Sequence, residues 1–411
     1  MTIAIPSTTQ VTAAHGSLYG LANLPYGVYS VAGSAPRVAT RVGETVVDLA
    51  LLLDDPTFAA PSLNAFMAQG YDRWVSVRSA LREALAGAVR VDALHDIDDV
   101  QLHLPVEVAD YADFYASEHH ASNLGRLFRP QNPDPLTPNW RHLPISYHGR
   151  AGTIVVSGTD VVRPNGQHKE RDDAAPAFGP STRLDIEAEL AFIIGSGSAL
   201  GTSVSVADAE LHIFGVALFN DWSARDLQAW EYVPLGPNLG KSFASTLSPW
   251  VVPLLALQGA KVPTPHQDPK PMPYLAADRP WGLDIELEVS WNGQVVTRPP
   301  YREMYWSPAQ MLAHLTSNGA STRAGDLFAS GTISGPDRES CGAFIELTWD
   351  GADPVEVAGQ QRTFLHDGDE VVITATAPGP GGSRLGFGEA RGRIVPAVSG
   401  TGAVAGVERE R

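Results

Sequence analysis

The segment NDWSARDLQAWEYVPLGPNLGKSF occupies residues 220–243 and joins two stretches of different periodicity. The apolar run before it, residues 213–219, is long enough for a buried strand. After the turn we expect a helix with four polar side chains on one face, at i, i+4, i+7 and i+11: Asp221, Arg225, Gln228 and Tyr232. Helices normally turn an apolar stripe to the core, so this face, followed by Lys241, suggests an active site. The alternative is a solvent-exposed helix face with Asp221 as its N-cap and Arg225 as its i+4 partner, and the pattern alone does not choose.

The composition is that of a soluble globular protein of mixed, β-rich (α+β) structure. The 411 residues are 44% hydrophobic and 18% charged, which allows one large or two ordinary domains with a substantial core. The 39 glycines and 32 prolines favour many turns and short strands over long helices.

The formal net charge of −17 argues against nucleic acid and against an anionic membrane as partners. A small anionic substrate remains compatible with it if cationic groups gather locally. We see no apolar segment of membrane-spanning length, and the start MTIAIPSTTQ does not resemble a signal peptide. The single cysteine, Cys341, excludes an internal disulfide, so the cytoplasm is the expected location.

The chain divides by character into three parts. Residues 1–105 hold strand-like runs and a helix expected at Tyr71–Ala86, whose buried stripe would be Trp74, Val77, Leu81 and Leu85. Residues 106–397 alternate short apolar strands with Gly/Pro turns and carry most of the polar motifs, as a β-sandwich or β-roll does. Residues 398–411 are expected to be a frayed tail.

Two further segments carry candidate chemistry. DYADFYASEHHASNLGRLFR, residues 110–129, would place Asp113 and Tyr115 on one face of an extended chain, while His119 and His120 cannot share a face. The alternative for this segment is a polar loop that leads into a short helix. GAFIELTW, residues 342–349, is expected to be a strand in which Glu346 stands among apolar neighbours.

Such a carboxyl has a raised pKa unless a charged group pairs with it. A histidine would be the natural partner and would give a pair that can activate water. The small-residue loop ASGTISGP, residues 329–336, would let a ligand approach the backbone and offers the hydroxyl of Thr332. It does not match a phosphate-binding loop.

Acidic pairs recur on two expected strands. In LDIEAELAF, residues 184–192, Glu187 and Glu189 share one face, with carboxylates about 6–7 Å apart. A hard divalent cation would relieve the repulsion between them. LDIELEV, residues 283–289, repeats the pattern with Glu286 and Glu288, and the spacing does not show which pair, if either, holds a metal.

Taken in order, these motifs resemble the fumarylacetoacetate hydrolase family. The resemblance covers residues 20–397 and rests on DFYASEHHASNLGRLFR, TPNWRHLPISYHGR, LDIEAELAF, the 220–243 segment, KSFASTLSPW, ASGTISGP and RLGFGEARG. It implies a small SH3-like N-terminal β domain, a large C-terminal β-roll or sandwich that carries the site, and a homodimer.

The resemblance also assigns roles. Carboxylate ligands of Ca²⁺ and/or Mg²⁺ would be Asp113, Glu187, Glu189 and Asp221, with a second magnesium site near Lys241 and Ser245. His120, and not His119, would be the catalytic base, with Glu346 as its acid partner. Groups around the developing negative charge would be Arg225, Gln228 and Lys241, and substrate contacts would be Tyr115, Arg129, Tyr147, Gln228, Tyr232 and Thr332.

The implied reaction is metal-dependent hydrolysis of a carbon–carbon bond in fumarylacetoacetate, giving fumarate and acetoacetate. This is the last step of tyrosine and phenylalanine breakdown, and its substrate is a small anionic diketo acid. One alternative is another member of the superfamily, such as an acylpyruvate hydrolase, a decarboxylase or a hydratase. Another is a calcium-stabilised β protein that binds a ligand without turning it over.

Overall fold

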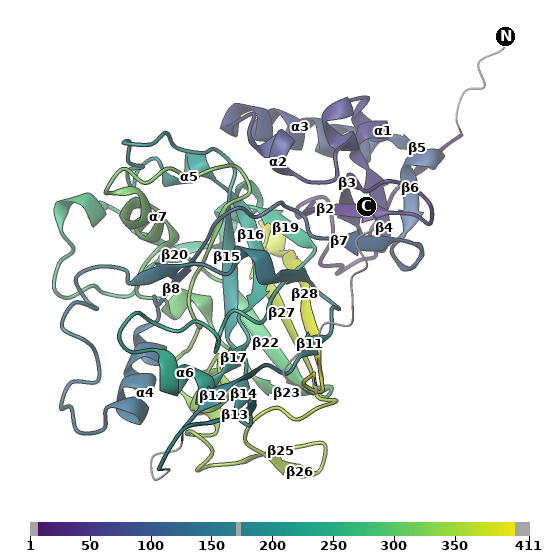
Figure 1. Cartoon of the computed structure of the whole chain (residues 1–411). Coiled ribbons are helices and arrows are strands. Elements are labelled where there is room, and N and C mark those ends of the chain that lie inside the picture. The colour runs from purple at the N-terminus through teal and green to yellow at the C-terminus, as the bar shows by residue number, and fades with distance from the viewer. Residues whose placement is uncertain (1–6, 170–173, 399–411) are drawn as a thin grey trace, which may run out of the picture.

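The structure is a computed structural model that describes residues 7–169 and 174–398. It consists of a small N-terminal part and a larger part that contains most of the strands (Figure 1). The predicted β-rich α+β class is confirmed. Residues 399–411 of the expected tail lie outside the described residues. Within those residues, no helix combines the length and apolar character that crossing a membrane requires.

The N-terminal part is a small sheet covered by helices on one side (Figure 1). Its longest helix, α3, spans Tyr71–Ala86 and buries the predicted apolar stripe. The other elements of this part are β1 (Thr8–Gln10), β2 (Tyr26–Ser30), β3 (Arg37–Val42), β4 (Thr45–Asp48), α1 (Leu49–Leu53), α2 (Asn64–Met67), β5 (Ala88–Arg90), β6 (Leu94–Asp96) and β7 (Gln101–His103).

One sheet crosses from the small part into the large one. Its main path runs β6-β4-β3-β2-β19-β16-β15-β24-β8-β9. Its strands in the large part are β8 (Tyr111–Phe114), β9 (Ser146–His148), β15 (Ala188–Ile194), β16 (Ile213–Asn220), β19 (Trp250–Pro253) and β24 (Leu327–Ala329). The two parts join where β2 pairs antiparallel with β19, with Gly27 opposite Trp250. A Cβ on Gly27 would lie 2.7 Å from the Trp250 ring, so this approach requires glycine.

A second sheet packs over the first. It has the order β11-β28-β27-β22-β23, made of β11 (Val161–Val162), β22 (Glu286–Trp291), β23 (Gln294–Thr297), β27 (Glu370–Pro378) and β28 (Arg384–Val395). The largest hydrophobic cluster lies between the two sheets and includes Leu190 and Phe192 of β15. Ala191 and Ile193 point the other way, into a cluster shared with the N-terminal part. Strand β15 is therefore buried on both faces.

Two short strands, β10 (Ile154–Val156) and β18 (Ser245–Leu247), extend the first sheet beside its main path, because β18 pairs with β16 and β10 pairs with β18. Around the two sheets lie α4 (Glu118–Phe128), α5 (Ala209–His212), α6 (Arg225–Glu231), α7 (Pro308–Thr316), α8 (Phe344–Leu347), β12 (Asn165–His168), β13 (Ala177–Pro180), β14 (Leu184–Asp185), β17 (Ser223–Ala224), β20 (Lys261–Pro263), β21 (Trp281–Leu283), β25 (Val355–Val357) and β26 (Gln360–Arg362).

Two sequence-based expectations about local structure are wrong. Asp221 is not on the helix and is not its N-cap: α6 begins at Arg225 and is preceded by Ala224 without a side-chain cap. The chain stays extended after β16 because β17 pairs with β14. Glu346 does not lie on a strand but in the four-residue helix α8, which the backbone bond from Leu347 N–H to Ala343 C=O closes.

Candidate active site

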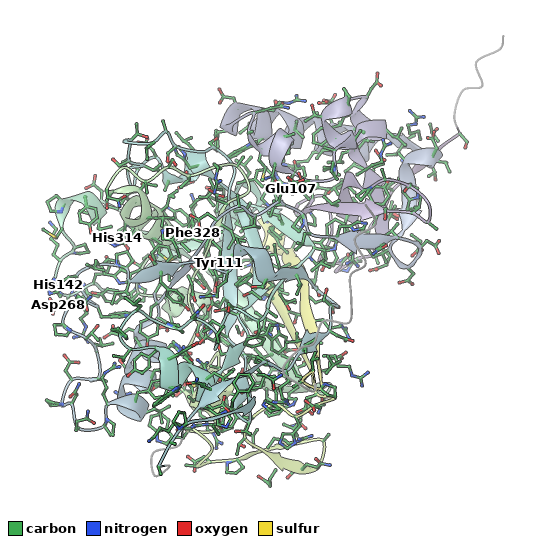
Figure 2. All side chains as sticks on the ribbon, viewed as in Figure 1. Glu107, Tyr111, His142, Asp268, His314 and Phe328 are labelled. Atoms are coloured by element: carbon green, nitrogen blue, oxygen red, sulfur yellow. The ribbon has the colours of Figure 1, made fainter. Side chains whose placement is uncertain are left out.

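The predicted site residues converge on one cavity of about 310 Å³. Helices α4 and α6 lie at the same end of the large part (Figure 1), and both contribute to its wall. Figure 2 shows Tyr111 near the middle of the large part, and Asp113, two residues further along β8, lines the cavity. The predicted residues among its lining are Asp113, Tyr115, His120, Arg129, Tyr147, Glu187, Gln228, Tyr232, Lys241 and Thr332.

Three buried carboxylates form a cluster at the bottom of the site. Asp113 belongs to β8 and Glu189 to β15, Asp221 directly follows β16, and one oxygen of each lies within 4.8 Å of the others. Glu189 Oε2 accepts a hydrogen bond from Gly331 N–H at 3.0 Å. Its Oε1 is buried and has no hydrogen-bond partner among the described residues. An orphaned anionic oxygen beside two other carboxylates is the arrangement that a divalent cation would satisfy.

The same crowding raises two pKa values in the cluster. Burial, together with the charges of Asp113, Glu187 and Asp221, raises the pKa of Glu189 well above its usual range. Burial and the charge of Asp221 raise the pKa of Asp113 to about 6, against the opposing effect of Arg150. Both carboxyls therefore hold their protons more tightly than ordinary ones, unless positive charge joins them.

Glu187 is in a different environment, although it was predicted to be a ligand with Glu189. Its Oε1 accepts a bond from Arg225 Nη1 at 2.7 Å, and its Oε2 is paired with Lys241 Nζ. Burial alone would raise the pKa of Glu187, but Lys241 and Arg225 lower it below the usual range. Glu187 is thus already neutralised by side chains and is not one of the three clustered carboxylates.

Lys241 and Ser245, predicted near a second magnesium site, both bind Asp221. Lys241 Nζ lies 2.8 Å from Asp221 Oδ2, and Ser245 Oγ donates to Asp221 Oδ1 at 2.8 Å. Burial opposes the charge on Lys241, yet Asp221 and Glu187 raise its pKa, so it stays an ammonium. These two contacts hold the Asp221 side chain in place, one through each of its carboxylate oxygens.

Arg150 is a site residue that the sequence analysis did not identify. Its Nη2 lies 2.8 Å from Asp113 Oδ2 and 2.9 Å from Asp221 Oδ2. Its guanidinium carbon stands 4.8 Å from the centroid of the Tyr111 ring and 4.8 Å from that of Tyr147. It lies in the LPISYHGR motif, but a lone arginine after glycine gives no signal of burial, and its left-handed backbone with φ 73° appears only in the fold.

The charges of the site fall short of neutrality. Among the described residues, the interacting carboxylates are Asp113, Asp185, Glu187, Glu189 and Asp221. The cationic partners are Arg150, Arg225 and Lys241. With every group ionised, two negative charges remain, which one divalent cation would balance.

His120 and Glu346 form a second group of interacting side chains in the site. His120 Nδ1 lies 2.6 Å from Glu346 Oε2, and both side chains are buried. Asn123 Nδ2 donates to Glu346 Oε1 at 2.9 Å and Ser334 Oγ to Oε2 at 2.9 Å. Burial would raise the pKa of Glu346, but His120 and these donors lower it, so the carboxylate is the stable form.

His119 points elsewhere. Its side chain is 36% exposed, and its closest acid is Glu303 at 4.0 Å, whereas His120 lines the cavity. The structure likewise separates the two acidic motifs. Glu286 and Glu288 lie on the outer face of β22, 3.8 Å from Arg384 and 3.0 Å from Arg298 respectively.

Arg225 is buried behind the cavity wall rather than in it. Its Nη1 donates to Gln228 Oε1 at 3.0 Å. Because the amide oxygen of Gln228 is engaged in this way, the amide nitrogen is the end left to face the cavity, which Gln228 lines. On the far side, Arg225 Nε donates to Asp185 Oδ2 at 2.8 Å, and Asp185 is a buried residue that the sequence analysis did not single out.

Family models match both parts of the chain, and together they define the class as the fumarylacetoacetate hydrolases. The model described as "Fumarylacetoacetate (FAA) hydrolase C-terminal" matches residues 110–395, and "Fumarylacetoacetase N-terminal" matches residues 22–105. The chain belongs to the fumarylacetoacetase family, as the motifs predicted.

Curated relatives extend over nearly the whole chain. The fumarylacetoacetases of Rattus norvegicus and Homo sapiens are each 44% identical to it, over 95% and 94% of this chain and 99% of their own lengths. That of Caenorhabditis elegans is 45% identical over 94% of this chain and 99% of its own length.

Solved structures share the fold at low identity. A fumarylacetoacetate hydrolase from Exiguobacterium antarcticum has a TM-score of 0.57 at 18% identity, covering 91% of this chain and 99% of that one. A maleylpyruvate hydrolase from Sphingobium sp. SYK-6 has a TM-score of 0.53 at 16% identity, covering 91% and 100%.

Proposed function

We propose that this chain hydrolyses fumarylacetoacetate at a carbon–carbon bond and yields fumarate and acetoacetate, the closing reaction of tyrosine and phenylalanine breakdown. Fumarylacetoacetases that are 44% identical over nearly the full length support this activity. The observation that carries it is the position of His120, whose Nδ1 lies 2.6 Å from Glu346 Oε2, on the wall of the cavity that Asp113 also lines. A proton acceptor beside an acidic cluster is what a metal-assisted hydrolase needs.

His120 is the proposed proton acceptor. The Glu346 carboxylate can only accept a hydrogen bond, so Nδ1 of His120 must carry the hydrogen and Nε2 is free to take a proton. A water molecule in the cavity would give one proton to Nε2 as its oxygen attacks the substrate ketone. Glu346 stabilises the imidazolium that results, because its own charge is maintained by Asn123 and Ser334. When the carbon–carbon bond then breaks, the departing carbon would take that proton from Nε2, which restores neutral His120.

Donors on the opposite wall would bind the negative charge that develops on the substrate. Gln228 presents its amide nitrogen, held by Arg225, and Lys241 presents an ammonium. Each preorganised donor of this kind contributes about 3–4 kcal/mol to transition-state stabilisation in other enzymes. We assign Arg225 to this group through its contact with Gln228 and not through contact with substrate.

The substrate's terminal carboxylate would meet Arg129 with Tyr115, Tyr147, Tyr232 and Thr332. Arg129 lines the cavity from the end of α4, and its Nη2 donates to Pro135 C=O at 3.2 Å. The Thr332 hydroxyl is buried and has no partner among the described residues, so it is available to a ligand.

The clustered carboxylates would hold a divalent cation, for which we propose Ca²⁺ and/or Mg²⁺ because all the ligand atoms are oxygens. When bound, such an ion polarises substrate oxygens and offsets the charge of the leaving fragment. Asp113, Glu189 and Asp221 are its proposed main ligands, with Glu187, Lys241 and Ser245 around them. A homodimer and a cytoplasmic location remain predictions.

A substrate comparison tests the proposed function. The purified protein is incubated with metal and either fumarylacetoacetate or simple acylpyruvates, and loss of the diketone ultraviolet absorbance is followed. We expect a higher kcat/KM for fumarylacetoacetate and loss of turnover in His120→Ala with the fold retained. Faster turnover of acylpyruvates would identify a different hydrolase of the superfamily, and unchanged turnover in His120→Ala would remove His120 from the mechanism.

A further inference from the structure

A single buried carboxylate connects the two walls of the cavity. Asp185 ends β14, and its side chain is inaccessible to solvent. Its Oδ1 accepts hydrogen bonds from Phe344 N–H at 2.7 Å and Ile186 N–H at 2.8 Å. Its Oδ2 accepts from Arg225 Nε at 2.8 Å and Ile345 N–H at 3.1 Å. Both oxygens therefore have two donors each, and none of these donors belongs to the cavity lining.

One side of this arrangement leads to the proton acceptor. Phe344 and Ile345 are the first two residues of α8, and Glu346 is the third. Because α8 has only four residues, the position of its first backbone N–H groups sets the position of Glu346 directly. Glu346 Oε2 in turn lies 2.6 Å from His120 Nδ1. A displacement of α8 would therefore lengthen this bond or turn the imidazole.

The other side of this arrangement leads to Gln228, which lines the cavity. Arg225 uses Nε for Asp185 and Nη1 for both Gln228 Oε1, at 3.0 Å, and Glu187 Oε1, at 2.7 Å. The guanidinium is planar and rigid, so fixing Nε also fixes the direction of Nη1. The orientation of the Gln228 amide then follows from the contact between Arg225 and Asp185.

We propose that Asp185 is a positioning residue that sets His120 and Gln228 on opposite sides of the substrate at once. The inference rests on the proposed function, because it assigns His120 and Gln228 to the reaction. Its physical basis is that four hydrogen-bond donors converge on the two side-chain oxygens of Asp185. Only a carboxylate has two oxygens that can accept all four bonds. An asparagine has the same shape, but its NH₂ group would face two donors whichever way the amide turns.

Asp185→Asn is the test, with Asp226→Asn as the matched control. Asp226 is also a buried carboxylate, in the same helix as Arg225, and accepts bonds from Ser181 Oγ at 2.6 Å and Thr182 N–H at 2.7 Å. It makes no contact with the cavity. Both variants lose one buried acceptor, so both should lower the thermal midpoint. Only Asp185→Asn should also displace His120 and Gln228.

We expect Asp185→Asn to lower kcat for fumarylacetoacetate by about 10–100-fold, as loss of an orienting contact does, with KM changed by less than about threefold. The acid limb of its pH–kcat profile should move to lower pH, because a displaced Glu346 stabilises the imidazolium less. Asp226→Asn should keep both kcat and the profile. Equal losses of kcat in the two variants, or an unmoved acid limb in Asp185→Asn, would overturn the proposal.

A second measurement does not depend on the substrate. The Nδ1 proton of His120, held by a short bond to Glu346, should give a downfield proton NMR signal that is absent from His120→Gln. Asp185→Asn should shift or abolish this signal, whereas Asp226→Asn should retain it. If wild-type protein does not cleave fumarylacetoacetate, the proposed function fails while this signal still tests the link from Asp185. An unchanged signal in folded Asp185→Asn would refute the link.

Discussion

Glu187 and Glu189 are only two residues apart in the chain, yet their carboxylates have opposite surroundings. Glu187 is paired with Arg225 and Lys241, which lower its pKa. Glu189 has one oxygen without any partner in the described residues, and burial raises its pKa. Glu189, not Glu187, is therefore the carboxylate that most needs a bound cation.

Replacing Glu189 should weaken metal binding, and the second acidic motif offers a control. We expect Glu189→Gln to reduce Ca²⁺ or Mg²⁺ affinity at least tenfold, as loss of a ligand does, because the orphaned oxygen becomes part of a neutral amide. Glu288→Gln, on the outer face of β22, should leave the affinity unchanged. Isothermal titration calorimetry measures both. Equal affinities in the two variants would place the metal elsewhere.

Metal affinity should fall as the pH falls through about 6. In the metal-free protein burial raises the pKa of Asp113 to about 6 and that of Glu189 well above its usual range. The folded state of the metal-free protein therefore binds more protons than the unfolded chain. As the pH rises through the folded-state pKa values, these two groups lower the free energy of unfolding. A cation must displace their protons, so affinity should drop about tenfold per pH unit for each proton displaced.

Calorimetry in two buffers of different ionisation enthalpy, at pH 7.5 and at pH 5, counts the protons released. Release that is larger at pH 5, together with weaker binding, is the expected result. An affinity that is constant between these values would show that neither carboxyl holds a proton there.

Arg150 should stabilise the metal-free protein more than the metal-bound protein. Its guanidinium bridges Asp113 and Asp221 in the interior, so Arg150→Met leaves two buried carboxylates without that partner. Breaking a buried pair of this kind costs about 3–5 kcal/mol. Urea unfolding with a chelator should show most of this loss, and saturating Ca²⁺ should recover part of it. A loss that is the same with and without metal would mean that Arg150 only fills space.

Glu346→Gln should lower kcat by about 10²–10⁴-fold, the range that general base catalysis contributes. The amide keeps the size of the side chain but cannot stabilise a protonated His120 from 2.6 Å. Glu303→Gln, beside the half-exposed His119, is the matched control and should leave kcat within about twofold, as surface changes usually do. Steady-state kinetics distinguishes the two, and equal rates would remove Glu346 from the reaction.

Much of the fold could be predicted because the spacing of apolar residues along the sequence indicates which side chains are buried. Strand β16 and helix α3 occur where the apolar patterns predicted them. The strand expected at residues 184–192 is divided into β14 and β15, so Glu189 lies on β15 while Glu187 lies in the gap between the two strands. The expected strand around Glu346 is wrong because alternation of apolar residues cannot reveal a distant acceptor. Asp185, about 160 positions away along the chain, binds Phe344 N–H and Ile345 N–H where α8 begins.

The helical spacing from Asp221 to Tyr232 was partly misleading. Asp221 reaches the site from an extended segment and only Arg225 and Gln228 from the helix. The charge at the centre of the site could not be predicted from local pattern either. Arg150 belongs to a loop and meets Asp113 and Asp221 only through the tertiary fold.

The pairing of β2 with β19 has a consequence for how the molecule holds together. Phe214 of β16 packs on Tyr26, Phe66 and Trp74 of the N-terminal part. The contact between the two parts therefore combines an aromatic cluster with the backbone hydrogen bonds between β2 and β19. A fragment that began after residue 105 would present a bare strand edge and an uncovered apolar face, both of which promote aggregation. The N-terminal part thus covers a strand edge and an apolar face of the large part, and heat should melt the two parts as one cooperative unit.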